Sequence, residues 1–183
     1  MIPKQTYLST KFKDLSFPIA ATFVTMGVCF LSLLAQVKLY LPISPVPITG
    51  QTFGVALIAL IYGRKLGIAT ISTYLVAGAF GAPIFAKFQS GLELGPTMGY
   101  LIGMWVSTFI IGTLSDNGYT KTWPKAFLSC VLGSLAVFAC GLSVLAFFVP
   151  ADSLLMMGLV PFIAGDLFKN TLASFLATRI YKL

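Results

Sequence analysis

A succession of long apolar runs, separated by short charged or Pro/Gly-rich segments, is the feature that most constrains this chain. A helical run of about 20 apolar residues is long enough to cross a bilayer. With 57% hydrophobic and only 9% charged residues among 183, the chain has more apolar surface than a soluble core of this size can bury. We therefore predict an all-α integral membrane protein with six transmembrane helices. The six runs span about residues 18–40, 51–62, 66–80, 97–115, 124–149 and 153–181.

Two of the six runs, 51–62 and 66–80, are short for a full crossing. Arg64 and Lys65 lie between them, so we predict a helical hairpin whose upper ends leave room for loops. The last run contains Pro161, and we expect it to bend there because proline removes a backbone donor.

The N-terminal segment superficially resembles a signal peptide, because lysines precede the first apolar run. That run is long enough to span, and no small-x-small cleavage site follows it. We predict a retained first helix, with residues 1–17 as a cytoplasmic or interfacial segment. Residues 18–183 then form the helical bundle, and 1–183 is a single transmembrane domain.

The distribution of basic residues predicts the orientation. A net charge of +7 could indicate nucleic-acid binding, but the Lys and Arg residues lie singly or in pairs between apolar runs, as membrane topology signals do. A cytoplasmic N-terminus places nine of them inside and two outside, and an even number of spans returns the C-terminus to the cytoplasm. The inner nine are Lys4, Lys11, Lys13, Arg64, Lys65, Lys121, Lys125, Arg179 and Lys182, and the outer two are Lys38 and Lys87.

The chain lacks the residues that several classes of chemistry require. Cys29, Cys130 and Cys140 are odd in number, lie in apolar runs and form no C-x-x-C pair, so neither a disulfide framework nor a zinc site is indicated. The chain has no His and no G-x-x-x-x-G-K-[ST] motif. We expect no metal and no cofactor, and ATP-driven transport would need an ATPase on another chain. A membrane enzyme has little support, since no nucleophile and base can be assembled.

Asp166 and Lys169 in the last run carry the strongest functional signal. Opposite charges three residues apart share one helix face, and charges at membrane depth are costly unless they face a cavity or a partner. They can bind each other or a common ligand. One interpretation is a structural ion pair, and the other, which we favour, is a site for a polar solute.

Two segments outside the predicted spans could cover such a site. Residues 41–52 contain three closely spaced prolines, which stiffen an extended backbone, and end in Thr49, Gln51 and Thr52. The segment could cover a ligand or act only as a rigid connector, and Gln51 could instead cap a helix or bond between helices.

Residues 81–100 are rich in Gly and Pro but remain apolar through Ile84, Phe85 and Phe88. We favour a re-entrant loop that lines a pocket. The alternative is a loop packed at the membrane interface with Phe85 and Phe88 as anchors.

Three separated motifs resemble the BioY family, the biotin-specific substrate-binding (S) components of energy-coupling-factor (ECF) transporters. The likeness covers nearly the whole chain from about Pro18. The motifs are Pro45-Val46-Pro47-Ile48-Thr49-Gly50-Gln51-Thr52, then Gly81-Ala82-Pro83 leading to Leu94-Gly95-Pro96-Thr97 and Gly99-Tyr100, and finally Pro161 with Gly165-Asp166 and Lys169.

The resemblance implies a six-helix S-component fold in the cytoplasmic membrane, with an external biotin pocket closed by the first and third loops. It also implies a transmembrane coupling subunit and two ATPase subunits as partners. The family's ligand-binding acid and lysine match Asp166 and Lys169, and Gln89 is the best match to a polar residue of the third loop. Lys87 is an added cation where relatives commonly carry a glycine-rich stretch. Ala21-x-x-x-Thr25 is the nearest match to the Ala-x-x-x-Ala face that meets the coupling subunit.

Biotin suits these residues chemically. Its ureido ring has two N–H donors and one carbonyl acceptor, which match the Asp166 carboxylate and the Lys169 ammonium. Phe85, Phe53 and Tyr100 would form an apolar wall. Alternatively, Lys169 binds the valerate carboxylate. A rival hypothesis of another class is a stand-alone facilitator or ion-coupled carrier that uses the same pair of charges as a gate.

Overall fold

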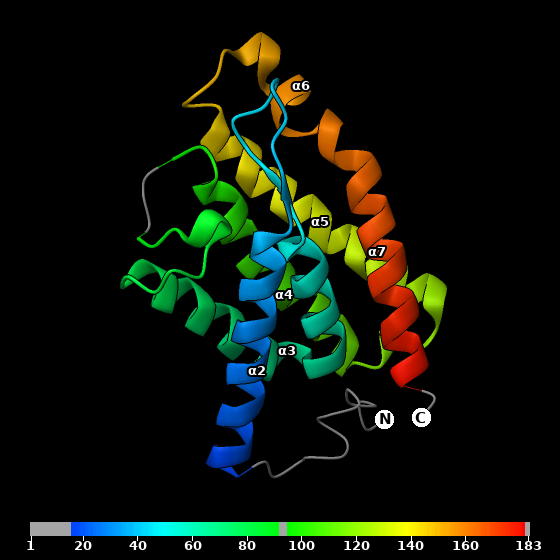
Figure 1. Ribbon diagram of the computed structural model, residues 1–183. Helices are drawn as coiled ribbons and strands as arrows, with labels where there is room; N and C mark the ends of the chain where they lie inside the picture. The colour runs from blue at the N-terminus through cyan, green and yellow to red at the C-terminus, as the bar shows by residue number, and fades with distance from the viewer. Residues whose placement is uncertain (1–15, 92–94, 182–183) are drawn as a thin grey trace.

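The computed structural model describes residues 16–91 and 95–181, and within them the architecture is a bundle of long helices (Figure 1). Within these two ranges, five helical stretches are long and apolar enough to cross a membrane. They are α2 (Phe17–Gln36), α3 (Gln51–Ala79), α4 (Met98–Asp116), α5 (Trp123–Leu145) and the stretch Ala151–Ile180, which joins η3 (Ala151–Ser153), α6 (Leu154–Gly158) and α7 (Val160–Ile180). The chain is a multi-pass membrane protein.

The first helix is shorter than predicted, because the chain leaves it to form a small β-hairpin. Strand β1 (Lys38–Leu39) pairs antiparallel with β2 (Ile48–Thr49), with Lys38 opposite Thr49. Gly50 closes the hairpin base by donating its N–H to the carbonyl of Val37 at 2.9 Å. The bundle is all-helical as predicted, and the only strands among the described residues are the two residue pairs of this hairpin.

Spans two and three correspond to the two helical arms of α3, which are separated by a non-helical residue, Gly63, next to the turn predicted at Arg64 and Lys65. This glycine has φ 72° and ψ −169°, a conformation that costs other residues more. Its two arms diverge in Figure 1. The Arg64 N–H donates to the Asp116 carboxylate at 3.1 Å instead of continuing the helix. The carbonyl of Leu60 accepts from the hydroxyls of Ser115 and Tyr181, so a carbonyl left without its helical partner at the break is still satisfied.

The predicted bend near Pro161 is confirmed. Helix α6 ends at Gly158, and Leu159, at φ −129° and ψ −60°, separates it from α7. Pro161 lies in the first turn of α7, where its missing N–H costs no helical hydrogen bond. A short 3-10 turn, η2 (Tyr119–Lys121), connects α4 to α5.

Small residues allow the helices to approach closely. A Cβ at Gly103 of α4 would lie 2.7 Å from the Cα of Val137 on α5. A Cβ at Gly112 would lie 2.7 Å from the Cα of Arg64, at the α3 break. Glycine at these two positions therefore brings α4 against both α5 and α3.

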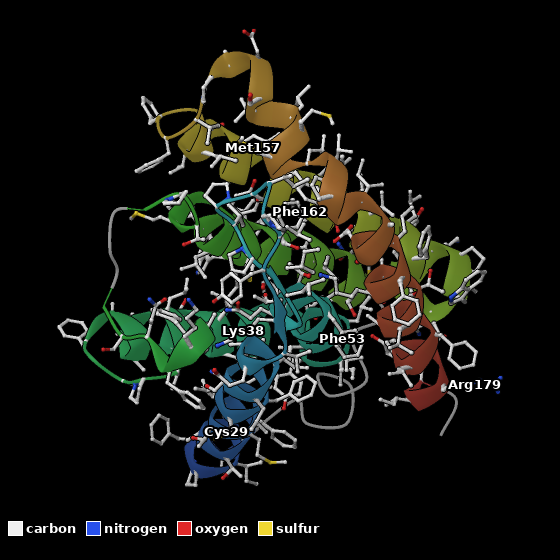
Figure 2. The ribbon with its side chains drawn as sticks, turned by 45° about the horizontal axis from the view of Figure 1, so that its top comes forward. Cys29, Lys38, Phe53, Met157, Phe162 and Arg179 are labelled. Carbon is white, nitrogen blue, oxygen red and sulfur yellow. The ribbon has the colours of Figure 1, made fainter. Side chains whose placement is uncertain are left out.

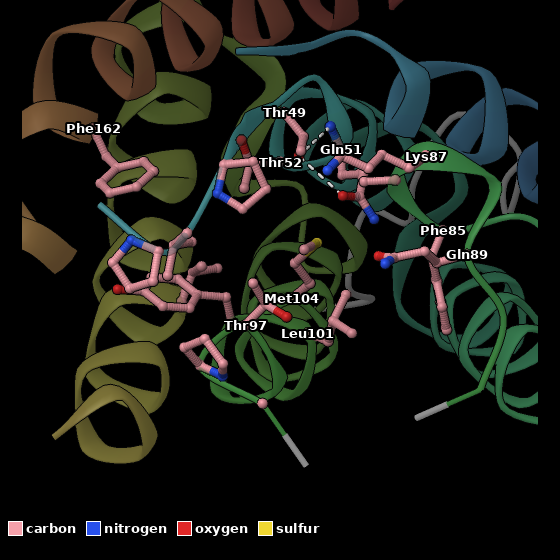
Figure 3. A pocket seen from close by; sticks show the side chains of 18 of the residues that line it. Thr49, Gln51, Thr52, Phe85, Lys87, Gln89, Thr97, Leu101, Met104 and Phe162 are labelled. Carbon is pink, nitrogen blue, oxygen red and sulfur yellow. Dashed lines mark hydrogen bonds between the residues drawn. The ribbon is translucent and has the colours of Figure 1, made fainter. Parts of the chain in front are cut away.

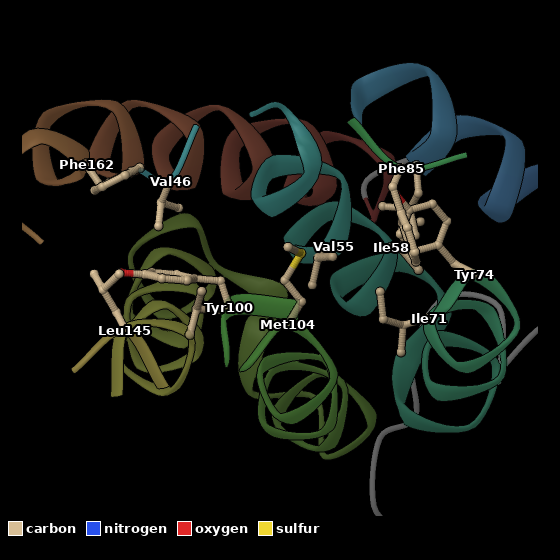
Figure 4. Packing of buried hydrophobic residues seen from close by; sticks show 12 residues of the cluster. Val46, Val55, Ile58, Ile71, Tyr74, Phe85, Tyr100, Met104, Leu145 and Phe162 are labelled. Carbon is tan, nitrogen blue, oxygen red and sulfur yellow. The ribbon is translucent and has the colours of Figure 1, made fainter. Parts of the chain in front are cut away.

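Two groups of buried side chains form the interior. The larger group joins Tyr74 of α3, Tyr100 and Met104 of α4, and Phe162 of α7 (Figure 4). A second, alanine-rich group lies between α3, α4, α5 and α7 and includes Ala59 and Cys130. Large apolar side chains cover much of the exterior of the helices (Figure 2), as expected where lipid is the solvent.

Candidate functional site

A cavity of about 350 Å³ opens between the two segments that the sequence singled out and the helices beneath them. This volume lies within the range of small-molecule sites. Loop 1, residues 37–50, contributes one wall, and loop 3, described at residues 80–91 and 95–97, contributes the facing wall (Figure 3). The lining includes seven of the eight residues predicted for the site, namely Thr49, Gln51, Phe85, Gln89, Tyr100, Asp166 and Lys169.

Lys169 of α7 ties the last helix to the base of loop 1. Its ammonium donates to the carbonyl of Thr49 at 3.1 Å and to the hydroxyl of Thr52 at 2.8 Å. Both partners line the cavity. An ammonium has three protons, so these bonds position Lys169 at the cavity wall and leave one donor for a ligand.

Asp166, one turn earlier, is only 8% exposed and also lines the cavity. Its Oδ2 accepts a hydrogen bond from the Asn170 amide at 2.8 Å, and the same amide donates to the Ser134 hydroxyl of α5 at 2.9 Å. A carboxylate can accept further hydrogen bonds. In the described part of the chain the acid and the lysine are thus bonded to different partners, and they are not locked to each other in a dry ion pair.

A relay of hydroxyl and amide groups connects the two loops. Thr49 donates to Oε1 of Gln51 at 3.0 Å, and Nε2 of Gln51 donates to the Tyr74 hydroxyl at 2.8 Å. Tyr74 in turn donates to the Ile84 carbonyl of loop 3 at 3.1 Å. The interhelical role left open for Gln51 is therefore confirmed, and the residue lines the cavity as well.

An aromatic wall faces these polar groups. The hydroxyl of Tyr100 donates to the Gly158 carbonyl at 2.8 Å, and its ring centroid lies 6.2 Å from that of Phe162. Phe138 lies 6.5 Å from Phe162. Sequence reasoning missed Phe162 and Phe138. The first could have been found, because it precedes Asp166 by four residues on one helix face, whereas nothing in the sequence marks Phe138.

Phe53 does not belong to this wall. Each helical residue is rotated by about 100° from its predecessor, so Phe53 points away from the cavity that Thr52 lines. It packs against the alanine-rich group instead and lies apart from Phe162 (Figure 2). The prediction that Phe53 lines the site is therefore wrong, and only the rotational position of this residue on the helix shows it.

Loop 3 enters the bundle through Phe85. Its ring is 7% exposed and stacks edge-on against Tyr74, with 5.4 Å between centroids. Gly78 makes room for the ring, since a Cβ there would clash with the ring carbons of Phe85. Phe88, by contrast, is exposed. The prediction of a loop that lines the pocket is confirmed for its described residues, with Phe85 rather than Phe88 inserted into the core.

The arrangement can hold a small molecule that is polar at one part and apolar elsewhere. An acceptor at Asp166 and a donor at Lys169 lie on one helix, and the Phe85, Tyr100 and Phe162 rings supply apolar surface. Such a lining, mostly apolar with a few placed polar groups, is typical of small-molecule sites.

Comparison with known proteins agrees with this geometry. The BioY family model matches residues 7–183, nearly the entire chain. This chain belongs to the BioY family. It is 39% identical over 146 residues to "Biotin transporter BioY" of Thermotoga maritima, which covers 78% of this chain and 85% of that protein. It is 37% identical to "Probable biotin transporter BioY" of Pyrococcus horikoshii, with 87% and 94% covered.

A solved structure extends the BioY likeness to three dimensions. The crystal structure of "the S-component for biotin from an ECF-type ABC transporter" superposes with a TM-score of 0.83 and 26% sequence identity. The alignment covers 96% of this chain and 94% of that one. The fold of the chain is therefore that of an ECF S component.

Proposed function

We propose that this chain is the biotin-binding S component of an ECF transporter and serves biotin uptake across the cytoplasmic membrane. The observation that carries the proposal is the cavity in which Asp166 and Lys169 meet an aromatic wall beneath two loops. Membership of the BioY family and the likeness to the S component for biotin support it. The protein binds and carries its ligand and performs no chemical conversion.

The ligand chemistry fits the lining. A ureido N–H donates to the Asp166 carboxylate, and the ureido carbonyl accepts from Lys169. Tyr100 and Phe162 contact the fused rings and the aliphatic chain. Gln89, at the loop 3 side of the cavity, supplies a further polar contact. Biotin is a transported ligand, and no cofactor takes part.

The proposed topology has six spans and cytoplasmic termini. It counts the two arms of α3 as separate spans on either side of Gly63. It is supported by the nine-to-two bias of basic residues. The beginning of α2 and the end of α7 also lie toward the same end of the bundle (Figure 1).

The proposed partners are a transmembrane coupling subunit and two ATPase subunits, since the sequence contains no nucleotide-binding P-loop. The face of α2 around Ala21 and Thr25 is the proposed contact with the coupling subunit. Thr25 donates its hydroxyl to the Ala21 carbonyl at 2.9 Å, so this face presents small apolar groups to a neighbouring helix.

Two measurements on the purified protein in detergent test the proposal. Mass spectrometry should identify biotin as the molecule that co-purifies, and titration calorimetry of ligand-free protein should give one tight biotin site. Absence of biotin binding would remove the proposal. Uptake into liposomes by this chain alone, driven by an ion gradient, would favour a self-sufficient carrier instead.

A further inference from the structure

Lys87 is the cation at the cavity to which the proposed function assigns no role. It lines the cavity together with Tyr40, and its Nζ lies 4.4 Å from the centroid of the Tyr40 ring. Among residues 16–91 and 95–181, no hydrogen-bond acceptor or carboxylate is bonded to this ammonium. With respect to the described residues, its donors are therefore available to a ligand.

Lys169, the other lysine that lines the cavity, already donates hydrogen bonds to protein groups. Two of its three protons are directed to the Thr49 carbonyl and the Thr52 hydroxyl. One remaining proton suits a single neutral carbonyl acceptor, whereas a carboxylate gains most from a cation with several free donors. The two lysines therefore suit different parts of one ligand.

The backbone at Lys87 is in a conformation that glycine would adopt more easily. Its φ is 64°, and that of the next residue, Phe88, is 56°. Left-handed φ values are uncommon for residues with a Cβ, and they recur at ligand clamps where the cost is compensated. Lys87 thus has a strained backbone conformation, and its side chain lines the cavity.

Lys87 also approaches the cavity from a different side than α7. Figure 3 shows Phe162 at one end and Lys87 at the other, next to Phe85 and Gln89. Asp166 and Lys169 follow Phe162 along α7, and Lys169 bonds to Thr49 and Thr52, which Figure 3 labels between Phe162 and Lys87. A ligand whose polar head is bound by α7 would therefore extend its other end toward loop 3.

We propose that Lys87, supported by the Tyr40 ring, forms an anion subsite that binds the carboxylate of biotin. This inference rests on the proposed function and resolves the pose, with the ureido head at Asp166 and Lys169 and the valerate carboxylate at Lys87. An ammonium on an aromatic face keeps its outer protons free for an anion. Lys87 is then a specificity-determining residue that favours the free acid over neutral derivatives.

The test compares biotin with biotinamide, which differs in having a neutral carboxamide at the end of the chain. Calorimetric titration of the wild-type protein should give tighter binding of biotin. Lys87→Met should weaken biotin binding about five- to tenfold and change biotinamide binding less than about twofold, as expected for loss of one partly exposed charged contact. The preference for biotin in the wild type should fall as salt is raised.

Two control variants separate this role from a structural one. Lys38→Met removes the other cation predicted on that side, which does not line the cavity, and should leave both affinities unchanged. Lys87→Arg keeps the charge and should retain most of the preference for biotin. Equal losses for both ligands in Lys87→Met, or no loss for biotin, would overturn the inference while leaving biotin binding by the wild type intact. Failure of the wild type to bind biotin at all would instead overturn the proposed function.

Discussion

Asp166 and Lys169 lie one helical turn apart, yet each is positioned by a different part of the bundle. The acid is bonded to Asn170, which is anchored on α5 by Ser134. The lysine is bonded to the base of loop 1 and the first turn of α3. The two residues should therefore contribute to binding in distinguishable ways.

For Asp166→Asn we expect biotin affinity to fall by about 10- to 100-fold, since a hydrogen bond to a charged group contributes roughly 1.5–3 kcal/mol. The amide has the same shape but presents an NH₂ group and only one acceptor oxygen to the ureido donors. Titration calorimetry measures the change. Asp152→Asn, at an exposed acid of η3, is the control and should bind as the wild type does. Unaltered affinity in Asp166→Asn would remove this residue from the site.

For Lys169→Met we expect two effects, because the lysine is both a ligand donor and a structural link. Biotin affinity should fall at least about tenfold, and the ligand-free protein should lose about 1–3 kcal/mol of stability as the Thr49 carbonyl loses its partner. Calorimetric titration and thermal unfolding in detergent measure the two separately. Lys65→Met, at an exposed lysine, should change neither. A Lys169→Met protein that binds normally would contradict the assignment.

At the scale of elements, the notable arrangement is the coupling of loops to helices. Tyr74 of α3 receives a hydrogen bond from Gln51 and donates one to Ile84 of loop 3. Gln36 at the end of α2 also donates to the Phe85 carbonyl at 3.0 Å. Loop 3 is thus attached to the helices that begin and end loop 1, so the two walls of the cavity share their supports.

Replacing Tyr74 by Phe tests this coupling. The hydroxyl is lost while the ring that packs on Phe85 remains, so Gln51 and the Ile84 carbonyl each lose a partner. We expect biotin to dissociate about three- to tenfold faster, with a stability loss of about 1–2 kcal/mol. Stopped-flow displacement with excess ligand measures the rate. Tyr62→Phe is the matched control, since no hydrogen bond from that hydroxyl occurs within the described residues. An unchanged rate in Tyr74→Phe would show that the loops open independently of this relay.

At the scale of the whole molecule, close helix packing determines how much of the interior is left for a ligand. Helix α4 approaches α5 and the α3 break through Gly103 and Gly112. In lipid, such contacts gain from van der Waals packing rather than from removal of apolar surface from water. The stability of the bundle should therefore depend strongly on small residues at these crossings.

Gly103→Ala should destabilise the protein by about 1–3 kcal/mol, because the added methyl meets backbone atoms of Val137 and Ala136 that cannot move aside. Gly165→Ala, where nothing lies within 4 Å of the added Cβ, should be neutral or slightly stabilising. Thermal unfolding of both variants in the same detergent makes the comparison. Equal melting temperatures of the two variants would show that α4 and α5 are not closely packed at Gly103.

Much of the fold follows from local chemistry that the sequence displays directly. Apolar runs predicted the positions of the long helices, Pro161 predicted the α6–α7 break, and the charges at Asp166 and Lys169 predicted where the last helix meets a cavity. These inferences succeed because helix length, proline geometry and the cost of burying charge depend on a residue and its near neighbours.

Only the tertiary structure decided which side chains meet. The exclusion of Phe53, the inclusion of Phe162 and Phe138, and the relay through Tyr74 depend on helix phase and on contacts between residues far apart in the chain. How the break between the two expected spans is stabilised likewise depends on distant partners, since Asp116, Ser115 and Tyr181 satisfy the groups freed at Gly63. A sequence displays which groups need partners, but packing in three dimensions selects the partners.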